Sequence, residues 1–243
     1  MAVNLTVGIL AKANDPDLFD CLSQLVFAAE VIVVVDGKKT DPSGLVASQS
    51  GAKVIEQKLE SFADSRNLIL TEAKYDWVLY LDTDERLTPE LKKSIQEVVR
   101  NNQINGGRIL RQDVFLGRQL RHGDSSIGLV RLGKKQAGKW VGRVHEVWEL
   151  SGEVIDLTGQ LKHFAHKSVA SYLEKMEFYT DLEVKKATRP SAWWQLLVYP
   201  VAKFIKVYFV QLGILDGWPG LVFASLNARY SFVKRKKLLK VGE

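Results

Sequence analysis

The sequence predicts an α/β fold built on a mixed, mainly parallel sheet with helices on both faces. Short apolar runs alternate with helix-like stretches through the first half of the 243-residue chain, and repeated strand–helix units imply a parallel sheet covered by helices. Val31–Val35 is an uninterrupted β-branched run ending in Asp36-Gly37, which is typical of a buried strand followed by a turn. The hydrophobic content of 46% suffices for a full core, in one large domain or one domain plus an appendage.

The N-terminal elements follow from the apolar runs and from helix boundary signals. Thr88-Pro89-Glu90 indicates a helix start, with Thr88 as N-cap and proline in the first turn. This helix is expected to end at about Arg100. The other helices are expected over residues 17–29, 41–50 and 64–73, and the strands over residues 3–10, 31–35, 52–55 and 77–81.

After Asn105 the pattern changes to short strands with glycine-rich turns. These strands are expected over residues 106–111, 128–132, 153–157 and 161–164, followed by a helix over residues 168–187. No repeat, low-complexity linker or clear boundary interrupts residues 1–185. We therefore expect one domain over residues 1–185 and a helical, membrane-associating extension over residues 186–243.

Positive charge and aromatic residues are concentrated near the C-terminus. Residues 185–243 contain 11 Lys and Arg against 2 Asp and Glu, together with 10 of the 23 aromatic residues, whereas residues 1–184 have a net charge of −3. A segment that is both basic and aromatic favours an anionic, partly apolar partner, which a lipid surface supplies. Nucleic-acid binding would require Lys and Arg spread over the globular face, so we expect no nucleic-acid partner.

A helix is expected over residues 193–215, and it is interrupted by Pro200, Lys203 and Lys206. A membrane-spanning helix needs about 20 predominantly apolar residues, so the pattern favours a helix lying in the membrane interface. The cations of residues 234–237 would add attraction to an anionic surface. The alternative is a helical hairpin packed on the domain or on a second subunit of a homo-oligomer.

The cysteine count and the N-terminal pattern bear on location. Cys21 is the single cysteine, which excludes an intrachain disulfide and fits a reducing compartment. The first residues lack the basic and long apolar regions of a secretion signal. We expect a cytoplasmic protein that is peripheral on the inner face of the plasma membrane.

Two of the expected strands end in acids, and ligands of open α/β sheets bind at the carboxyl ends of the strands. One strand ends in Asp36 and the other in Asp82-Thr83-Asp84-Glu85. The Asp-x-Asp pair favours a divalent cation, Mg²⁺ or Mn²⁺, because these ions bind through one or two carboxylates plus substrate phosphates. We expect Asp84, helped by Asp82, to hold this metal. The alternative is that the acids only complement the N-terminus of the next helix.

Three further positions have side chains suited to a site. Arg66 lies at an expected helix start, where its charge opposes the helix dipole, so an anionic ligand is favoured over an ion pair with Asp64. Asp124 is a loop acid and a candidate catalytic carboxylate. His163 and His166 stand near a strand end, where packing and hydrogen bonding are favoured over metal binding because no third ligand is close in sequence.

The stretch WVLYLDTDERLTPEL, residues 77–91, resembles the donor-site motif of the inverting family 2 glycosyltransferases with the GT-A fold. More narrowly, it resembles the small bacterial members that build lipopolysaccharide core and related glycans. The other matching segments are residues 31–36, Arg66-Asn67, the R-V-H-E block at 143–146, His163-Phe164 and DGWPG at 216–220. Nearly the whole chain is covered. The residues after the first two strands depart from the family pattern, which leaves the donor's identity open.

The resemblance implies metal-dependent transfer of a sugar from a nucleotide-diphosphate sugar to a glycan or lipid-linked acceptor, with inversion. Asp36, Arg66 and Asp82 would bind the donor. The base is expected to be Glu146, because Asp82 and Asp84 are occupied by donor and metal, and Asp124 is the second candidate. Arg143 and His145 would support the site.

Three other functions fit parts of the sequence. Transfer to a polyprenyl phosphate would need no base, since that acceptor is already an anion. A nucleotidyltransferase also uses paired acids and metal, but it normally has a glycine-rich phosphate loop near the first strand, where residues 7–15 contain only Gly8. A non-enzymatic membrane-surface protein would need only the basic, aromatic tail.

Overall fold

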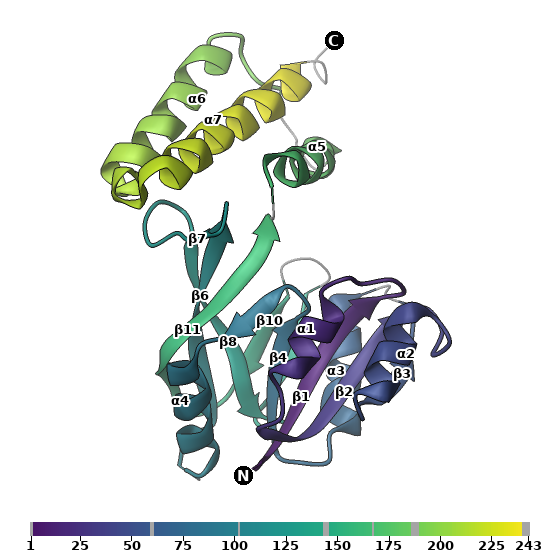
Figure 1. Ribbon diagram of the computed structural model, residues 1–243. Coiled ribbons are helices and arrows are strands. Elements are labelled where there is room, and N and C mark those ends of the chain that lie inside the picture. Colours follow the sequence, from purple (N-terminus) through teal and green to yellow (C-terminus); the bar gives the residue numbers. More distant parts are fainter. Residues whose placement is uncertain are drawn as a thin grey trace. The chain divides into compact units, whose positions relative to one another are not determined.

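The computed structural model describes residues 2–58, 61–101, 103–142, 146–166, 168–185 and 190–239. The chain packs into two compact units, which Figure 1 shows as ribbons. The first unit comprises residues 1–111 and 128–163, and the second comprises residues 112–127 and 164–243. By packing, residues 112–127 and 164–185 therefore group with the C-terminal helices, so the compact units divide the chain differently from the expected boundary at residue 185.

The first unit is built on a mixed sheet, as predicted. Four strands lie parallel in the order β3-β2-β1-β4, and β8 then pairs antiparallel with β4. The order continues through β6 and β11 to β5. The strands are β1 (Val3–Lys12), β2 (Ala28–Asp36), β3 (Lys53–Glu56), β4 (Trp77–Asp82), β5 (Glu85–Leu87), β6 (Gly106–Phe115), β8 (Ser126–Lys134) and β11 (Val154–His166).

Side-chain alternation in the central strands explains why helices cover both faces. In β2, Val33 and Val35 pack in one apolar cluster while Ile32 and Val34 pack in another. The first cluster contains side chains of α1 (Leu18–Ser23), α2 (Pro42–Gln49) and α4 (Pro89–Val99), and the second contains side chains of α3 (Phe62–Glu72). A separate hairpin of β9 (Gly138–Val141) and β10 (Val147–Leu150) supplies Trp140 and Trp148 to the second cluster.

The start of α4 is fixed as the sequence predicts. The Thr88 hydroxyl accepts a hydrogen bond from Leu91 N at 3.3 Å, and it also accepts one from Gln160 N of β11 at 3.1 Å. Gly159 lies beside this helix start with φ +91°, and a Cβ there would come within 2.3 Å of Leu91 N. A side chain at residue 159 would therefore push β11 away from the cap.

The second unit is mainly helical. It contains β7 (Arg118–Gln119), α5 (Val169–Lys185), α6 (Gln195–Ile205), a π-helical turn η1 (Lys206–Val210), a 3-10 turn η2 (Gly213–Asp216) and α7 (Gly217–Leu239). Its core contains Phe115, Tyr172, Val207 and Phe223. Asp216, from the DGWPG segment, accepts hydrogen bonds from the backbone N of Arg121 and of His122.

Three sequence-based expectations for the elements are wrong. The helix expected over residues 193–215 ends in the π turn and breaks at Leu212, which has φ 60°. The helix expected over residues 17–29 is the short α1, because the chain already joins the sheet at Ala28. The strands expected over residues 153–157 and 161–164 are one strand, β11.

Replacing Thr88 with alanine tests the junction between α4 and β11. The Thr88→Ala change removes one acceptor shared by two backbone N–H groups, so the free energy of unfolding is expected to fall by about 1–2 kcal/mol. Urea unfolding of the wild type and the variant measures the loss. Thr88→Ser keeps the hydroxyl and should stay near the wild type. Equal losses for alanine and serine would contradict a contribution from the hydroxyl.

Candidate functional site

The two acid-ended strands meet at one edge of the sheet. β2 and β4 both pair parallel with β1, where Lys12 is the register partner of Asp36 and Leu10 that of Asp82. The predicted placement of both acids at the carboxyl ends of parallel strands is therefore confirmed. Their roles toward a ligand stay predictions.

A buried carboxylate shapes the turn that holds the Asp-x-Asp pair. Glu85 is 0% exposed, and its Oε2 accepts a hydrogen bond from Asp82 N at 2.9 Å. Gln24 holds the next residues, since its Nε2 donates to Glu85 O at 3.0 Å and its Oε1 accepts from Leu87 N at 2.7 Å. With the turn fixed in this way, the Asp84 side chain stays 25% exposed.

Three arginines neutralise the acids at the end of β4. Arg66 Nη2 lies 3.1 Å from Asp82 Oδ1, and Arg131 Nη2 lies 2.9 Å from Asp82 Oδ2. Arg131 also lies 4.0 Å from Glu85 Oε1, and Arg111 lies 3.8 Å from the same oxygen. Because α3, β6 and β8 each supply one of these cations, the cluster joins elements that are far apart in the sequence.

Arg66 adds Glu146 to the cluster, beside Asp82, Asp84 and Glu85. Its Nη1 donates to Glu146 Oε1, so one guanidinium contacts Asp82 and Glu146 together. The guanidinium carbon lies 4.5 Å from the centroid of the Trp140 ring, and Trp148 stacks on Trp140 with ring centroids 5.4 Å apart. Tyr80 donates its hydroxyl proton to Arg66 O at 2.7 Å. The two tryptophans therefore form a stack in the apolar core that contacts the Arg66 guanidinium through Trp140.

The position of Arg66 corrects one step of the sequence argument. α3 begins at Phe62 with Ser61 as N-cap, so Arg66 lies beyond the first turn of the helix and not at its start. The helix dipole therefore explains little about this residue. Its charge is accounted for by the two carboxylates that it contacts.

Burial and neighbouring charges shift the pKa values of Asp82 and Glu85 in opposite directions. Burial alone would raise the pKa of Asp82, but the charges of Arg131 and Arg66 outweigh it and lower that pKa well below its usual range. Burial, followed by the negative charge of Asp82, raises the pKa of Glu85 to about 7, against the opposing charges of Arg131 and Arg111. Asp82 is thus fully ionised at neutral pH, whereas Glu85 is close to its own pKa there.

The remaining predicted residues lie elsewhere. Asp124 belongs to the second unit, where it accepts hydrogen bonds from Lys203 and, at 2.6 Å, from Gln211. Burial would raise the pKa of Asp124, but these two donors more than offset it and lower the pKa. Arg143 and His145 lie outside the described residues.

Sequence reasoning missed four members of the cluster. Arg111, Arg131 and Glu85 were given no role, and His163 was assigned to packing, whereas its Nε2 lies 3.6 Å from Asp84 Oδ2. A signal for Arg131 was present, because a charge inside the apolar run Leu129–Leu132 needs a partner if the strand is buried. No such signal marks His163, since its approach to Asp84 depends on β11 pairing with β5.

The described residues fit a metal that arrives with a phosphate ligand better than a preformed metal site. Among them, no group of three or more His, Cys, Asp or Glu could hold a cation. Asp84 and His163 are adjacent, partly exposed and of suitable ligand type. Further oxygens would have to come from the ligand.

Replacing Glu85 with glutamine tests the buried carboxyl group through the pH dependence of stability. Its pKa is raised from 4.5 in the unfolded chain to about 7 in the fold, so the folded state retains a proton that the unfolded state has lost. Stability from this group is therefore present below the unfolded pKa and lost as pH rises through about 7. Glu85→Gln should flatten that fall in urea unfolding between about pH 5 and about pH 8. The exposed Glu153→Gln should keep the wild-type slope, and an unchanged slope in Glu85→Gln would contradict the assignment.

The family model described as Glycosyl transferase family 2 matches residues 18–147, which is more than half of the chain. An uncharacterized glycosyltransferase of Rickettsia typhi is 22% identical over 263 residues, covering 98% of this chain and 87% of that one. The lipopolysaccharide core biosynthesis glycosyltransferase LpsC of Rhizobium meliloti is 25% identical over 254 residues, covering 96% and 91%.

Among solved structures, the chain is similar to glucosyl-3-phosphoglycerate synthase from Mycobacterium tuberculosis in complex with Mn²⁺, uridine diphosphate and phosphoglyceric acid. That similarity has a TM-score of 0.43 and 15% identity, over 70% of this chain and 73% of that one. With a family model matched across the acid-ended strands and the arginine cluster, the chain belongs to glycosyl transferase family 2 and has the GT-A fold.

Proposed function

We propose that this glycosyltransferase is an inverting, metal-dependent enzyme that moves a sugar from a nucleotide-diphosphate sugar to a glycan or lipid-linked acceptor. The expected pathway is the synthesis of lipopolysaccharide core or a related cell-envelope glycan. The relative LpsC, named for lipopolysaccharide core biosynthesis, supports this acceptor class.

The single observation behind the proposal is the bridge that Arg66 makes between Asp82 and Glu146. Asp82 ends a strand at the edge where α/β sheets bind nucleotides, and Glu146 lies 80 residues further along than Arg66. The guanidinium thus joins a donor-side acid to an acid from the second half of the unit. A sugar-transfer reaction needs the groups that bind the donor to lie close to the group that activates the acceptor.

The arginines supply the positive charge that a diphosphate requires. Arg131 Nη1 is buried and has no hydrogen-bond partner within the described part of the chain. A buried donor of this kind costs free energy unless a ligand satisfies it. We assign Arg66 and Arg131 to the diphosphate, and Asp36 and Asp82 to the nucleoside.

Asp84 and His163 would hold the divalent cation, Mn²⁺ or Mg²⁺. The cation supplies neutralisation of the negative charge that develops on the leaving nucleoside diphosphate. Asp84 suits this task because it is partly exposed and lies beside His163, while the three arginines already occupy Asp82 and Glu85.

Glu146 is the proposed base. The acceptor hydroxyl attacks the anomeric carbon from the face opposite the diphosphate, the bond from that carbon to the diphosphate oxygen breaks, and the configuration inverts. Glu146 takes the hydroxyl proton as the new bond forms. Arg66 positions this carboxylate through the ion pair described above.

Replacing Asp84 with asparagine tests the metal assignment. Asp84→Asn removes one carboxylate ligand at nearly constant shape, so activity should fall at least about 10²-fold while the melting temperature stays near wild type. The measurement is sugar transfer with added Mn²⁺, beside a titration of donor binding. Chelation of the wild type should give the same loss. Full activity in excess chelator would contradict metal dependence.

Replacing Glu146 with glutamine tests the base. Glu146→Gln should lower kcat by at least about 10²-fold, the usual scale for a lost acid–base group, with the donor dissociation constant nearly unchanged. The exposed Glu149→Gln, on the neighbouring strand β10, is the matched control. Asp124→Asn should have much less effect, since that carboxylate is engaged by Lys203 and Gln211. A Glu146→Gln variant near wild type would instead favour an acceptor that is already an anion, such as a polyprenyl phosphate.

A further inference from the structure

The helix α6 has its apolar side chains on the outside. None of its residues is buried in the unit, and Leu197 and Val201 are 65% and 59% exposed. Exposed apolar residues recur at helical spacing into the π turn and continue through η2. We call this set the apolar stripe, and it comprises Trp194, Leu197, Val198, Val201, Ile205, Phe209, Leu212, Leu215 and Trp218. A contiguous exposed patch of this kind marks an interaction site.

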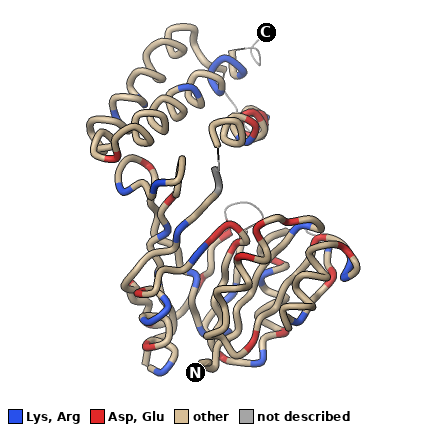
Figure 2. Tube along the Cα trace, in the orientation of Figure 1, with Lys and Arg blue, Asp and Glu red and all other residues tan. Residues whose placement is uncertain are grey.

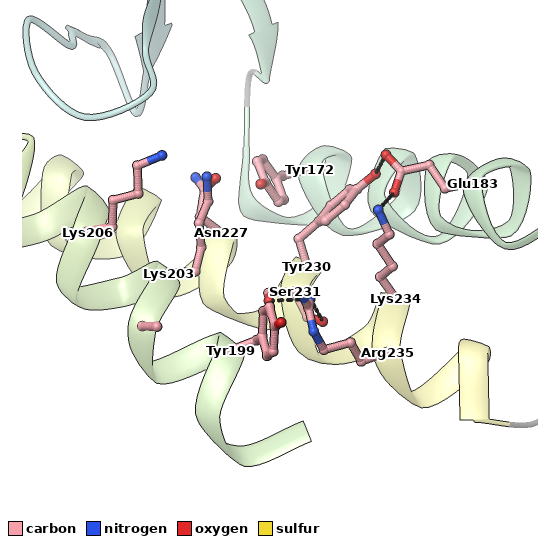
Figure 3. Close-up of a pocket in the computed structure, with 11 residues that line it drawn as sticks. Tyr172, Glu183, Tyr199, Lys203, Lys206, Asn227, Tyr230, Ser231, Lys234 and Arg235 are labelled. Carbon is pink, nitrogen blue, oxygen red and sulfur yellow. Dashed lines mark hydrogen bonds and ion pairs between the residues drawn. The ribbon is translucent and has the colours of Figure 1, made fainter. Parts of the chain in front are cut away.

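Lys203 of α6 and Lys206 of η1 lie away from the stripe and line a cavity. The cavity measures about 530 Å³ and lies between α5, α6 and α7. Figure 3 shows Lys203 and Lys206 on one side of it, with Lys234 and Arg235 of α7 beyond. Its lining includes four cations and a single acid, Glu183. A helix with apolar residues outward and cations inward is the inverse of a helix on a water-exposed surface.

Part of this charge is available to a ligand. Lys234 pairs with Glu183 at 2.6 Å, and Lys203 pairs with Asp124. Lys206 makes no ion pair with any residue that the structure describes. The Arg235 guanidinium lies 3.8 Å from the Tyr199 ring centroid, and its buried Nε has no hydrogen-bond partner among the described residues. The cavity therefore suits an anionic group with several acceptor oxygens.

We propose that the apolar stripe docks on an anionic phospholipid bilayer. Aromatic and aliphatic side chains would enter the interface. Attraction to negative headgroups would come from the end of α7, where residues 234–237 are all basic (Figure 2) and Lys237 also pairs with Glu177 and Asp181. Such a surface is the one expected for a peripheral protein at the inner face of the plasma membrane.

Two other occupants of the stripe fit the observations less well. A second copy of the chain would bury the stripe but would bring together two C-terminal segments that each carry 11 Lys and Arg against 2 Asp and Glu in residues 185–243. A membrane-spanning arrangement is the second alternative. Within the described residues, no single helix is long and apolar enough to cross a membrane. The helix pair Gln195–Val210 and Gly213–Leu239 together has the length and composition of a span, but its two parts are bent by 70°. Lys203 and Lys206 stand within its first half.

The test is flotation of the full chain with vesicles of phosphatidylcholine alone and of phosphatidylcholine mixed with phosphatidylglycerol. Wild type should bind the mixed vesicles, and high salt should release it because screening weakens exposed charges. Val201→Glu should reduce binding at least about tenfold, since it places a charge in the apolar face. Val26→Glu, at a residue 86% exposed in the first unit, is the matched control and should bind as wild type.

The charge contribution is tested separately. Lys236→Gln, at the exposed end of α7, should weaken binding to mixed vesicles by roughly fivefold and leave binding to neutral vesicles unchanged, whereas Lys93→Gln on α4 should change neither. Leu197→Glu is the second stripe variant if Val201→Glu shows a lowered melting temperature. No vesicle binding at low salt would overturn the proposal, as would binding that resists both high salt and alkaline washing.

One further outcome would also overturn it. This is a wild-type dimer that Val201→Glu converts to monomer without any change in vesicle binding, which would assign the stripe to a second copy. All these measurements are made without a nucleotide-sugar donor, so their outcome does not depend on the proposed transfer reaction.

Discussion

The first unit depends on the neutralisation of buried carboxylates at the end of β4. Glu85 is fully buried and Asp82 accepts from two arginines, and a buried acid without such partners is strongly destabilising. The compensating cations come from α3, β6 and β8. Assembly of the sheet and assembly of the site are therefore the same event, since the turn that presents Asp84 is stable only when these distant elements have joined it.

The local features of the first half were predictable because their causes are local. Buried β-branched runs, the N-cap at Thr88 and the acids at two strand ends are all encoded within a few neighbouring residues. Parallel pairing then follows from the connections, which places Asp36 and Asp82 on one edge. The sequence accordingly indicated the location of the site and its acids.

The partners of those acids were not predictable, because they depend on pairing between distant strands. Arg111 and Arg131 lie in β6 and β8, and the approach of His163 to Asp84 requires β11 to pair with β5. The single strand β11 was also missed, since Gly159 resembles a turn signal in the sequence but lies at a close approach to α4. Residues 143–145, in a block that resembles the family, lie outside the described residues.

The second unit shows why interrupting charges need not end an apolar surface. In the sequence, Lys203 and Lys206 divide a long apolar run. In the fold, helical spacing places them beside α5 and α7, where they line a cavity, and leaves Val201 and Ile205 facing outward. The lysines and the apolar residues thus occupy different sides of one helix, and a count of charges along the chain cannot show this. The core of the second unit forms around Phe115, Tyr172 and Val207, and the stripe reaches it only through Phe209, which contacts Phe204 and Tyr208. Most of the stripe is therefore not part of this packing, and its apolar character needs a reason outside the core of the unit.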